Sequence, residues 1–472
     1  VVGKWYNNEI KNDLKLLGLN NIKNLKKFNP KKSEVSKITE KLLLKTKSAS
    51  DILKWKLPFN FPADAAYDSI LKHQRRNEVD IHSPDFSILV FNGIENLLAA
   101  DNLIKKNNFD AVFISQICNF DQGGIAWAAL RRKTPTFVIT GHGGLNRFFK
   151  KIELSKLFYN DDTPRISHLK ILDDKQKENL KQVGKKYIND RVSGRTFELG
   201  SLYSFQVNNQ FINKSEIYSK LKFDPKFPIV CIFAQNWFDY PHAFGMKNFR
   251  DFREWIDITI KTISSIKNVN WLIKPHPCDA WYGGETINNI ISNDEYKNIK
   301  ICPEKISGTS VLNLIDAGVT VHGTIGLELT ALNKQVLLAD KGWYDHYKFC
   351  SSSKSILEYK SKLKNMKWSK KITSSKLDKL YLFTGLLFCA PKSQASFFIG
   401  NDTEQSDLFP MILDIFKNKK SQLDFEIRTI VEWIKTNEPS FHLYKMTSSK
   451  KFCNFEIPLS SNYVNTLKKR KV

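Results

Sequence analysis

The feature that most constrains the fold is a repeated alternation of apolar runs of strand length with amphipathic stretches of helix length. It is clearest between residues 227 and 340. The apolar runs lack polar alternation, which indicates strands buried on both faces of a parallel sheet. The region therefore predicts a doubly wound α/β domain. Its expected strands are 227–236, 269–277, 296–304, 319–323 and 334–340, and its expected helices are 249–266, 310–318 and 324–333.

A shorter alternation precedes this region and predicts a second parallel sheet. Its expected strands are 86–92, 110–116 and 134–141, and the expected helices between them are 92–108 and 123–133. The chain of 472 residues also exceeds the roughly 250–300 residues at which single cores stop growing. We therefore expect a Rossmann-like N-terminal domain with a helical extension (1–225), a Rossmann-like C-terminal domain (226–370) and a helical segment packing back across both (371–472).

The charge balance points to an anionic partner. Lys and Arg number 73 against 48 Asp and Glu, a net charge of +25. Nucleic acid, an acidic membrane surface and phosphorylated substrates are the classes that such a surplus favours. A genome that favours lysine codons explains the same surplus without any partner. The basic residues are dispersed and no nucleic-acid-binding module is recognisable, so we expect no nucleic acid partner.

Other classes are excluded by what the sequence lacks. It contains no G-x-G-x-x-G and no G-x-x-x-x-G-K-[ST], so dinucleotide redox and P-loop chemistry are not indicated. Its seven cysteines are scattered without a C-x-x-C pair, which favours a reducing compartment. No run approaches 18 consecutive apolar residues and the first residues lack an apolar signal core. We expect a cytoplasmic protein with peripheral contact to an anionic membrane.

The first motif is Lys274-Pro275-His276-Pro277, directly after an expected strand. Two prolines make the turn rigid, because they fix the backbone and remove two N–H donors. Lysine supplies a point charge and histidine a directional donor, a combination suited to a phosphate. The alternative is an ordinary proline-rich turn with a surface lysine. Its place at the carboxyl end of a strand, where open α/β sheets bind ligands, favours phosphate binding.

The second motif runs from His322 through Gly323 and Thr324 to Glu328. It predicts a strand end, a glycine turn and a helix start that Thr324 caps. A helix N-terminus offers free N–H groups to an anion, and Glu328 has the length to bond ribose hydroxyls. The alternative is an ordinary capped helix with a solvated glutamate.

The third motif is the glycine-rich turn around His142 after the strand 134–141. Glycines leave this imidazole accessible, so it is a candidate general base for an acceptor hydroxyl. Asp121, which follows the strand 110–116, is a rival base, and Asn119 lies beside it. The alternative is a turn with an incidental histidine.

Weaker signals follow the first and last strands of the C-terminal region. These polar residues either face the cleft or are ordinary polar loop residues, and the sequence does not decide between the two. Those expected to face donor nucleotide or sugar are Gln235, Asn236 and Asp340, with Asp239, His242, Trp343 and Tyr344 as further candidates.

Two of these segments together resemble a known family. IKPHP (273–277) combined with DAGVTVHGTIGLELTALNKQVLLAD (316–340) looks like the glycosyltransferases of bacterial capsule and surface-polysaccharide synthesis. The resemblance implies the GT-B fold, in which two Rossmann-like domains face a cleft. It covers 226–345 well and the N-terminal half loosely. The glycine-rich turn at 142–144 is distantly similar to CDP-glycerol glycerophosphotransferases, although LNRFF follows it here instead of a basic loop.

The resemblance implies transfer of sugar from a nucleotide donor to a glycan or lipid-linked acceptor. No metal is expected, because the sequence has no D-x-D triplet and the helix start, lysine and histidine can stabilise the leaving phosphate. The donor would be linked to UDP, GDP, CDP or CMP, and no further cofactor is expected. Lys274, His276, Gly323 and Thr324 would meet its phosphates, and Glu328 and His322 its nucleoside or sugar. The alternatives are a CDP-polyol phosphotransferase and a sugar-nucleotide epimerase of the same fold.

Overall fold

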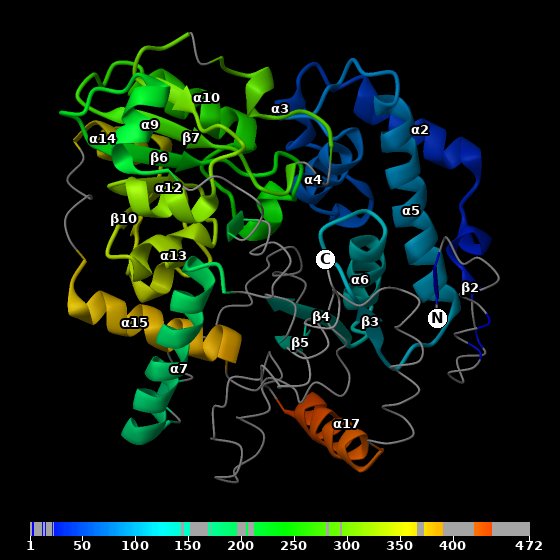
Figure 1. The fold of residues 1–472 in the computed structure, drawn as a ribbon. Coiled ribbons are helices and arrows are strands. Elements are labelled where there is room, and N and C mark those ends of the chain that lie inside the picture. The colour runs from blue at the N-terminus through cyan, green and yellow to red at the C-terminus, as the bar shows by residue number, and fades with distance from the viewer. Residues whose placement is uncertain are drawn as a thin grey trace.

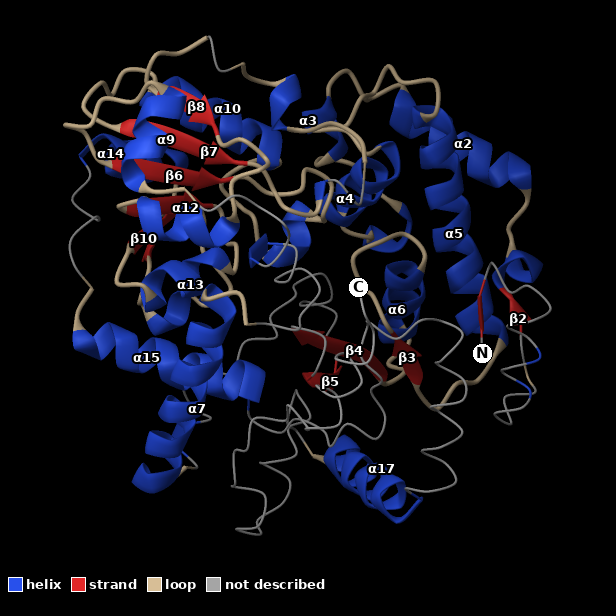
Figure 2. Cartoon of the chain, in the orientation of Figure 1, coloured by secondary structure: helices blue, strands red, loops and turns tan. Residues whose placement is uncertain are grey.

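The α/β class is confirmed by the computed structural model, which has two units side by side (Figures 1 and 2). It describes residues 2–3, 12, 15, 21, 23–142, 146–151, 169–170, 172–195, 204–205, 212–279, 283–292, 295–365, 372–389 and 420–436. Nothing below concerns the structure of the others. Among the residues described, no helix combines the length and apolar character needed to cross a bilayer.

The first unit is mostly helical around a small sheet. Its helices are η1 (Leu25–Phe28), α2 (Lys32–Leu43), α3 (Ala49–Ile52), η2 (Pro58–Asn60), α4 (Ala63–Gln74), α5 (Phe86–Lys106) and α6 (Gln122–Arg131). Its strands are β1 (Val2–Gly3), β2 (Lys23–Asn24), β3 (Val112–Ile114), β4 (Thr136–His142) and β5 (Asn146–Lys151). β3 and β4 run parallel, whereas β4 and β5 run antiparallel.

Two expectations for this unit are wrong. The apolar run 86–92 is the start of the 21-residue helix α5 and not a strand. Its buried positions include Phe86, Val90, Ile94 and Leu97, which recur with helical spacing. The sheet described here is also mixed and not all parallel. Only three residues separate β4 from β5, too few for the crossover that a parallel neighbour requires.

The second unit is built on a six-stranded parallel sheet. Its strands are β6 (Ile229–Phe233), β7 (Asn270–Lys274), β8 (Ile299–Ile301), β9 (Ala317–Thr320), β10 (Gln335–Leu338) and β11 (Ser351–Ser352). Their order across the sheet is β11-β10-β9-β6-β7-β8. The five strands expected from the sequence are confirmed, and β11 adds a short edge. The chain starts in the middle, builds one half outward, and returns to β9 to build the other half.

Helices cover both faces of this sheet. They are α7 (Asp174–Val192), α9 (Lys214–Leu221), η5 (Pro241–Phe244), α10 (Phe252–Ile263), η6 (Ile287–Asn289), α12 (Gly308–Leu314), α13 (Ile325–Ala331), η7 (Asp345–Tyr347), α14 (Ile356–Asn365), α15 (Ser374–Thr384) and η9 (Gly385–Cys389). Alternate β6 residues enter different cores: Val230 and Ile232 face α10 and α14, while Ile229 and Cys231 face α12 and α13. Burial on both faces explains the continuous apolar runs.

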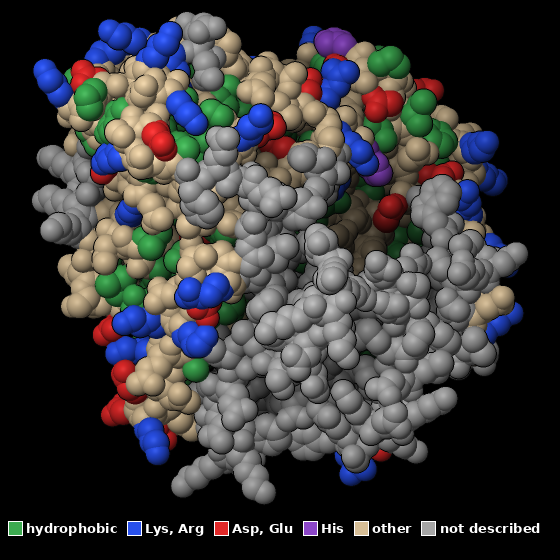
Figure 3. Space-filling view, in the orientation of Figure 1, with side chains coloured by type: hydrophobic (Ala, Val, Ile, Leu, Met, Phe, Trp, Pro, Cys, Tyr) green, Lys and Arg blue, Asp and Glu red, His purple; other side chains and the backbone are tan. Residues whose placement is uncertain are grey.

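The last helices contact different units. α15 packs on α7 beside the six-stranded sheet, where Lys181 and Asp378 form an ion pair at 3.4 Å. α17 (Lys420–Lys435) places Trp433 against Phe137 of β4, with ring centroids 5.6 Å apart. On the face seen in Figure 3, Lys and Arg side chains are spread over both units and mixed with acidic ones.

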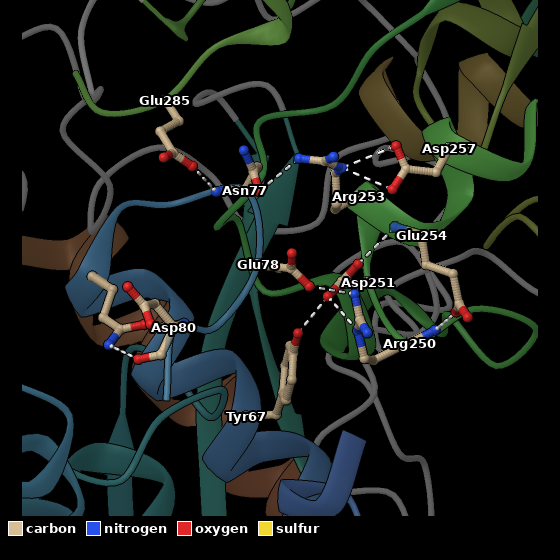
Figure 4. A network of polar contacts seen from close by, with 11 residues as sticks. Tyr67, Asn77, Glu78, Asp80, Arg250, Asp251, Arg253, Glu254, Asp257 and Glu285 are labelled. Atoms are coloured by element: carbon tan, nitrogen blue, oxygen red, sulfur yellow. Dashed lines mark hydrogen bonds and ion pairs between the residues drawn. The ribbon is translucent and has the colours of Figure 1, made fainter. Parts of the chain in front are cut away.

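The two units are joined through α4 and α10. The Tyr67 hydroxyl donates to the Asp251 carboxylate, which is fully buried (Figure 4). Arg250 contacts the same carboxylate at 2.9 Å and Glu78 of the first unit at 2.7 Å. Arg253 donates to Asn77 at 3.2 Å. One apolar core also continues from α4 and α5 to β6 and α10, so this junction is packed as well as polar.

Candidate functional site

The site lies at the point where the strand order of the large sheet reverses. β6 and β9 are neighbours, but the chain leaves them in opposite directions across the sheet. Such a reversal is where open α/β sheets bind ligands, outside the carboxyl ends of the strands. Gln235, just after β6, donates from Nε2 to Thr320 Oγ1 at the end of β9, at 2.9 Å. This bond holds the two loops together.

Lys274 ends β7, the other neighbour of β6. Its ammonium donates to the backbone carbonyl of Ile306 at 3.2 Å, and the residue is half-buried. Among the residues described, no carboxylate pairs with it. A partly buried ammonium bonded only to a carbonyl keeps its charge available for an anion.

His276 follows in the same turn and is fixed in one tautomer. The backbone N–H of Cys278 donates to its Nδ1 at 3.2 Å, so the neutral ring carries its proton on Nε2. Burial lowers the pKa of His276 to about 4, against a smaller opposing effect of Asp239. Near neutral pH this side chain is therefore an uncharged hydrogen-bond donor.

Asp279 is a site residue that the sequence analysis missed. Asn236, after β6, donates from Nδ2 to Asp279 Oδ1 at 3.2 Å. Burial raises the pKa of Asp279 to about 7. The Asn236 Oδ1 atom is buried and has no hydrogen-bond partner among the residues described. The signal in the sequence was its position, two residues beyond Pro277 in the same turn.

The glycine turn of the second motif is held by a hydrogen bond from a buried tyrosine. The Tyr344 hydroxyl donates to the carbonyl of Gly323 at 2.7 Å, and Tyr344 is buried. Tyr344 was expected to meet a base or sugar, and here it holds the turn. Thr324 precedes α13 as predicted, but in the described chain its side chain makes no capping bond. With only seven residues, α13 also offers a short dipole.

Glu328, His322 and Asp340, which were expected to meet the donor, are buried and contact other parts of the protein. Glu328 is buried on α13, and its Oε1 accepts from Arg191 Nε of α7 at 2.6 Å. His322 is 3% exposed, and burial lowers its pKa to about 4. Asp340 accepts three backbone bonds at 2.7 Å, from Lys247, Asn248 and Lys341. The ligand-binding roles of these three residues stay predictions, and their present contacts are structural.

The first unit contributes the segment after β3. Asp121 lies at the start of α6, and its carboxylate accepts from Asn96 of α5. Asn119 lies close enough to Tyr240, in the loop that follows β6, to act on the pKa of that hydroxyl, which burial raises to about 12. His142 ends β4, but its side chain lies outside the described residues. Its role and that of Asp121 as bases stay predictions.

The described residues hold no group of three or more His, Cys, Asp or Glu side chains arranged to bind a metal ion. At the junction of Figure 4, the carboxylates of Glu78 and Asp251 are paired with Arg250.

Three solved structures are similar to parts of this chain. Thermosulfurimonas dismutans KpsC, a beta Kdo 2,4 transferase, is 12% identical, with 57% of this chain and 78% of that chain covered and a TM-score of 0.39. A UDP-N-acetylglucosamine 2-epimerase is 10% identical (61% and 71% covered, TM-score 0.23). MnaA of S. aureus, determined with UDP, is 10% identical (63% and 76% covered, TM-score 0.24). No family model and no curated protein sequence matches the chain.

Proposed function

We propose that this protein is a GT-B glycosyltransferase that moves a sugar from a nucleotide donor to a surface-polysaccharide acceptor. The observation that carries the proposal is the convergence of three loops at the strand-order reversal. Gln235 bonds Thr320 across β6 and β9, and Lys274 stands at the end of the adjacent strand β7. This is the place where a doubly wound sheet binds a nucleotide.

The donor phosphates would lie against Lys274 and His276. The ammonium offers a charge without a carboxylate partner in the described chain, and the neutral imidazole offers a directed Nε2–H. Both groups are held before the donor arrives, so they stabilise the charge that develops on the leaving phosphate without reorganisation. Transfer breaks the bond between the sugar's anomeric carbon and the phosphate oxygen, which keeps the electron pair.

The acceptor would enter from the side of the first unit, where Lys72 of α4 pairs with Asp239 of the loop after β6 at 3.4 Å. A net charge of +25 favours an anionic glycan or a lipid-linked acceptor at an acidic membrane surface. The proposed place of action is the cytoplasmic face of that membrane.

Nucleotide binding tests the proposal. Isothermal titration with UDP, GDP, CDP, CMP and the free nucleosides should identify one nucleotide class that binds. In Lys274→Ala, affinity for that nucleotide should fall about 10- to 100-fold, the value of a charge-assisted hydrogen bond, while nucleoside affinity changes little. Lys261→Ala is the matched control, since Lys261 is exposed on α10. Absence of nucleotide binding, or equal binding by Lys274→Ala, would overturn the proposal.

A further inference from the structure

A buried carboxylate–imidazole pair spans the junction beside the proposed site. Asp68 of α4 places Oδ1 2.7 Å from His242 Nδ1 of η5. Its other oxygen, Oδ2, accepts the backbone N–H groups of His242 at 2.9 Å and Ala243 at 3.3 Å. Three hydrogen bonds thus hold the Asp68 carboxylate against η5, two from His242 and one from Ala243. From the sequence, His242 was one of several weak candidates to face the cleft, and Asp68 was not singled out.

The pair fixes which ring nitrogen carries the proton. A carboxylate acceptor keeps the neutral ring protonated at Nδ1, which leaves Nε2 with a lone pair. Within the described chain Nε2 has no hydrogen-bond partner, and 11% of the His242 side chain is exposed. The Tyr67 ring packs edge-on against the imidazole, with centroids 5.7 Å apart, and restricts its rotation.

The pair lies where the two walls of the proposed site meet. Tyr240, two residues before His242, lies close enough to Asn119 of the first unit for Asn119 to act on its pKa. Ser69, next to Asp68, accepts the backbone N–H of Phe120 at 3.1 Å. Asp239 in the same loop is close enough to His276 to act on its pKa. The segment from Asn236 to His242 thus contacts the first unit through Asp239 and Lys72, at 3.4 Å, and the phosphate-binding turn through Asn236 and Asp279, at 3.2 Å.

We propose that His242 is the general base of the transfer and that Asp68 is its positioning residue. This inference rests on the proposed function. The acceptor hydroxyl gives its proton to His242 Nε2 while its oxygen bonds to the anomeric carbon. The bond from that carbon to the donor phosphate breaks, and the nucleotide leaves with the electron pair. The imidazolium then releases its proton to solvent.

The surrounding charges favour a base that works near neutral pH. Burial lowers the pKa of His242, but the charge and hydrogen bond of Asp68, together with the charges of two further carboxylates, outweigh it, so the pKa lies above that of a free imidazole. Asp64 on α4 and Asp251 at the start of α10 act in the same direction. Removing the Asp68 charge should therefore lower the pKa of His242, and the acid limb of a rate profile should move to lower pH.

The first test needs no substrate. Histidine side chains labelled with nitrogen-15 report the tautomer directly by NMR in the full-length protein. We expect His242 to be in the Nδ1–H form at pH 8.5 and its titration to move to lower pH in Asp68→Asn. The spectrum of His242→Asn assigns the signal. An Nε2–H tautomer, or a titration that Asp68→Asn does not move, would overturn the inference.

The second test measures turnover. Nucleotide release would be followed from UDP-glucose, UDP-N-acetylglucosamine, GDP-mannose and CMP-Kdo with a panel of saccharide acceptors. For the donor that wild type uses, kcat of His242→Asn should fall about 100-fold or more, with nucleotide Kd within twofold of wild type. Asp68→Asn should lower kcat and shift the acid limb to lower pH. His82→Asn is the control, because His82 is an exposed histidine of the first unit.

The outcomes separate the two proposals. If wild type turns over and the kcat of His242→Asn is within fivefold of the wild-type kcat, the role of His242 as general base is overturned, but the proposed transferase function is not. No nucleotide release by wild type from any donor would overturn both. If Asp68→Asn lowers both kcat and the melting temperature but leaves the acid limb of the rate profile unmoved, Asp68 has only a structural role.

Discussion

Arg191 and Glu328 form an ion pair inside the protein, with Nε and Oε1 2.6 Å apart and side chains 12% and 4% exposed. The pair joins α7 to α13, the helix that follows the glycine turn of the candidate site. A carboxylate at this position was expected to meet a ribose. Its present partner gives it a second role, which is to fix α13 against α7.

Removing the arginine should therefore destabilise the fold more than it weakens nucleotide binding. Arg191→Met leaves Glu328 as an uncompensated buried charge, so we expect the free energy of unfolding to fall by about 3–5 kcal/mol. Urea denaturation measures the loss. Arg191→Met/Glu328→Gln should recover part of it, because no charge is then left unpaired. A fall below about 1 kcal/mol for Arg191→Met would contradict a buried pair.

His322 should make the protein less stable as the pH falls. In the unfolded chain it binds a proton below its ordinary pKa of 6.5, whereas in the fold it does so only near pH 4. Between those values the unfolded state holds more protons, so stability rises with pH and is lost on acidification. The difference is worth about 3 kcal/mol over this window.

Unfolding in urea between pH 4 and 7.5 tests this slope. His322→Asn should lose less stability than wild type on going from pH 6.5 to 4, because it has no proton to bind. His82→Asn should keep the wild-type slope, since His82 is exposed. Identical slopes for wild type and His322→Asn would rule out the buried, neutral histidine.

Gly326 is required by Tyr344. A Cβ at this position would lie 2.0 Å from the Tyr344 hydroxyl oxygen, which itself holds Gly323. Gly326→Ala should cost about 1–3 kcal/mol through overpacking, and it should weaken nucleotide binding by moving the turn. Gly326→Ala/Tyr344→Phe removes the clashing oxygen and should recover part of the stability. A double variant as unstable as the sum of the two single ones would contradict this contact.

Tyr67 should contribute to stability through its hydroxyl. Tyr67→Phe deprives the buried Asp251 of one donor (Figure 4), which we expect to cost about 1–3 kcal/mol. Tyr218→Phe is a matched control, because its hydroxyl donates to the Phe227 carbonyl from a half-buried position. Differential scanning calorimetry should show the larger loss for Tyr67→Phe. Equal losses would mean that the junction contact adds nothing beyond an ordinary hydrogen bond.

The second unit was predictable because its strands are buried on both faces. Continuous apolar runs such as 229–233 have no other common explanation when helical stretches separate them. The apolar run 86–92 was wrongly predicted as a strand, because a helix buried on most sides has the same local composition. The Asn92-Gly93 dipeptide, usually a turn signal, also favoured a break here, but Gly93 lies inside α5.

The sequence located the loops of the site but not the direction of each side chain. His322 and Asp340 stand in the right segments, yet one is buried and the other binds backbone N–H groups. The pairing of Asp68 with His242 could not be predicted from the sequence, because the two residues lie 174 positions apart. Such contacts depend on tertiary packing, which a single sequence does not display.

Tyr67 and Asp68 are successive residues of α4, and each is bonded to a different segment of the second unit. A hinge motion between the units would have to break both contacts at once and expose two carboxylates that are almost fully buried. We expect α4 to move with the large sheet as one rigid body throughout turnover. Substrates would then exchange by local movement of loops around a fixed frame, and the spacing between catalytic groups would be set at folding rather than at binding.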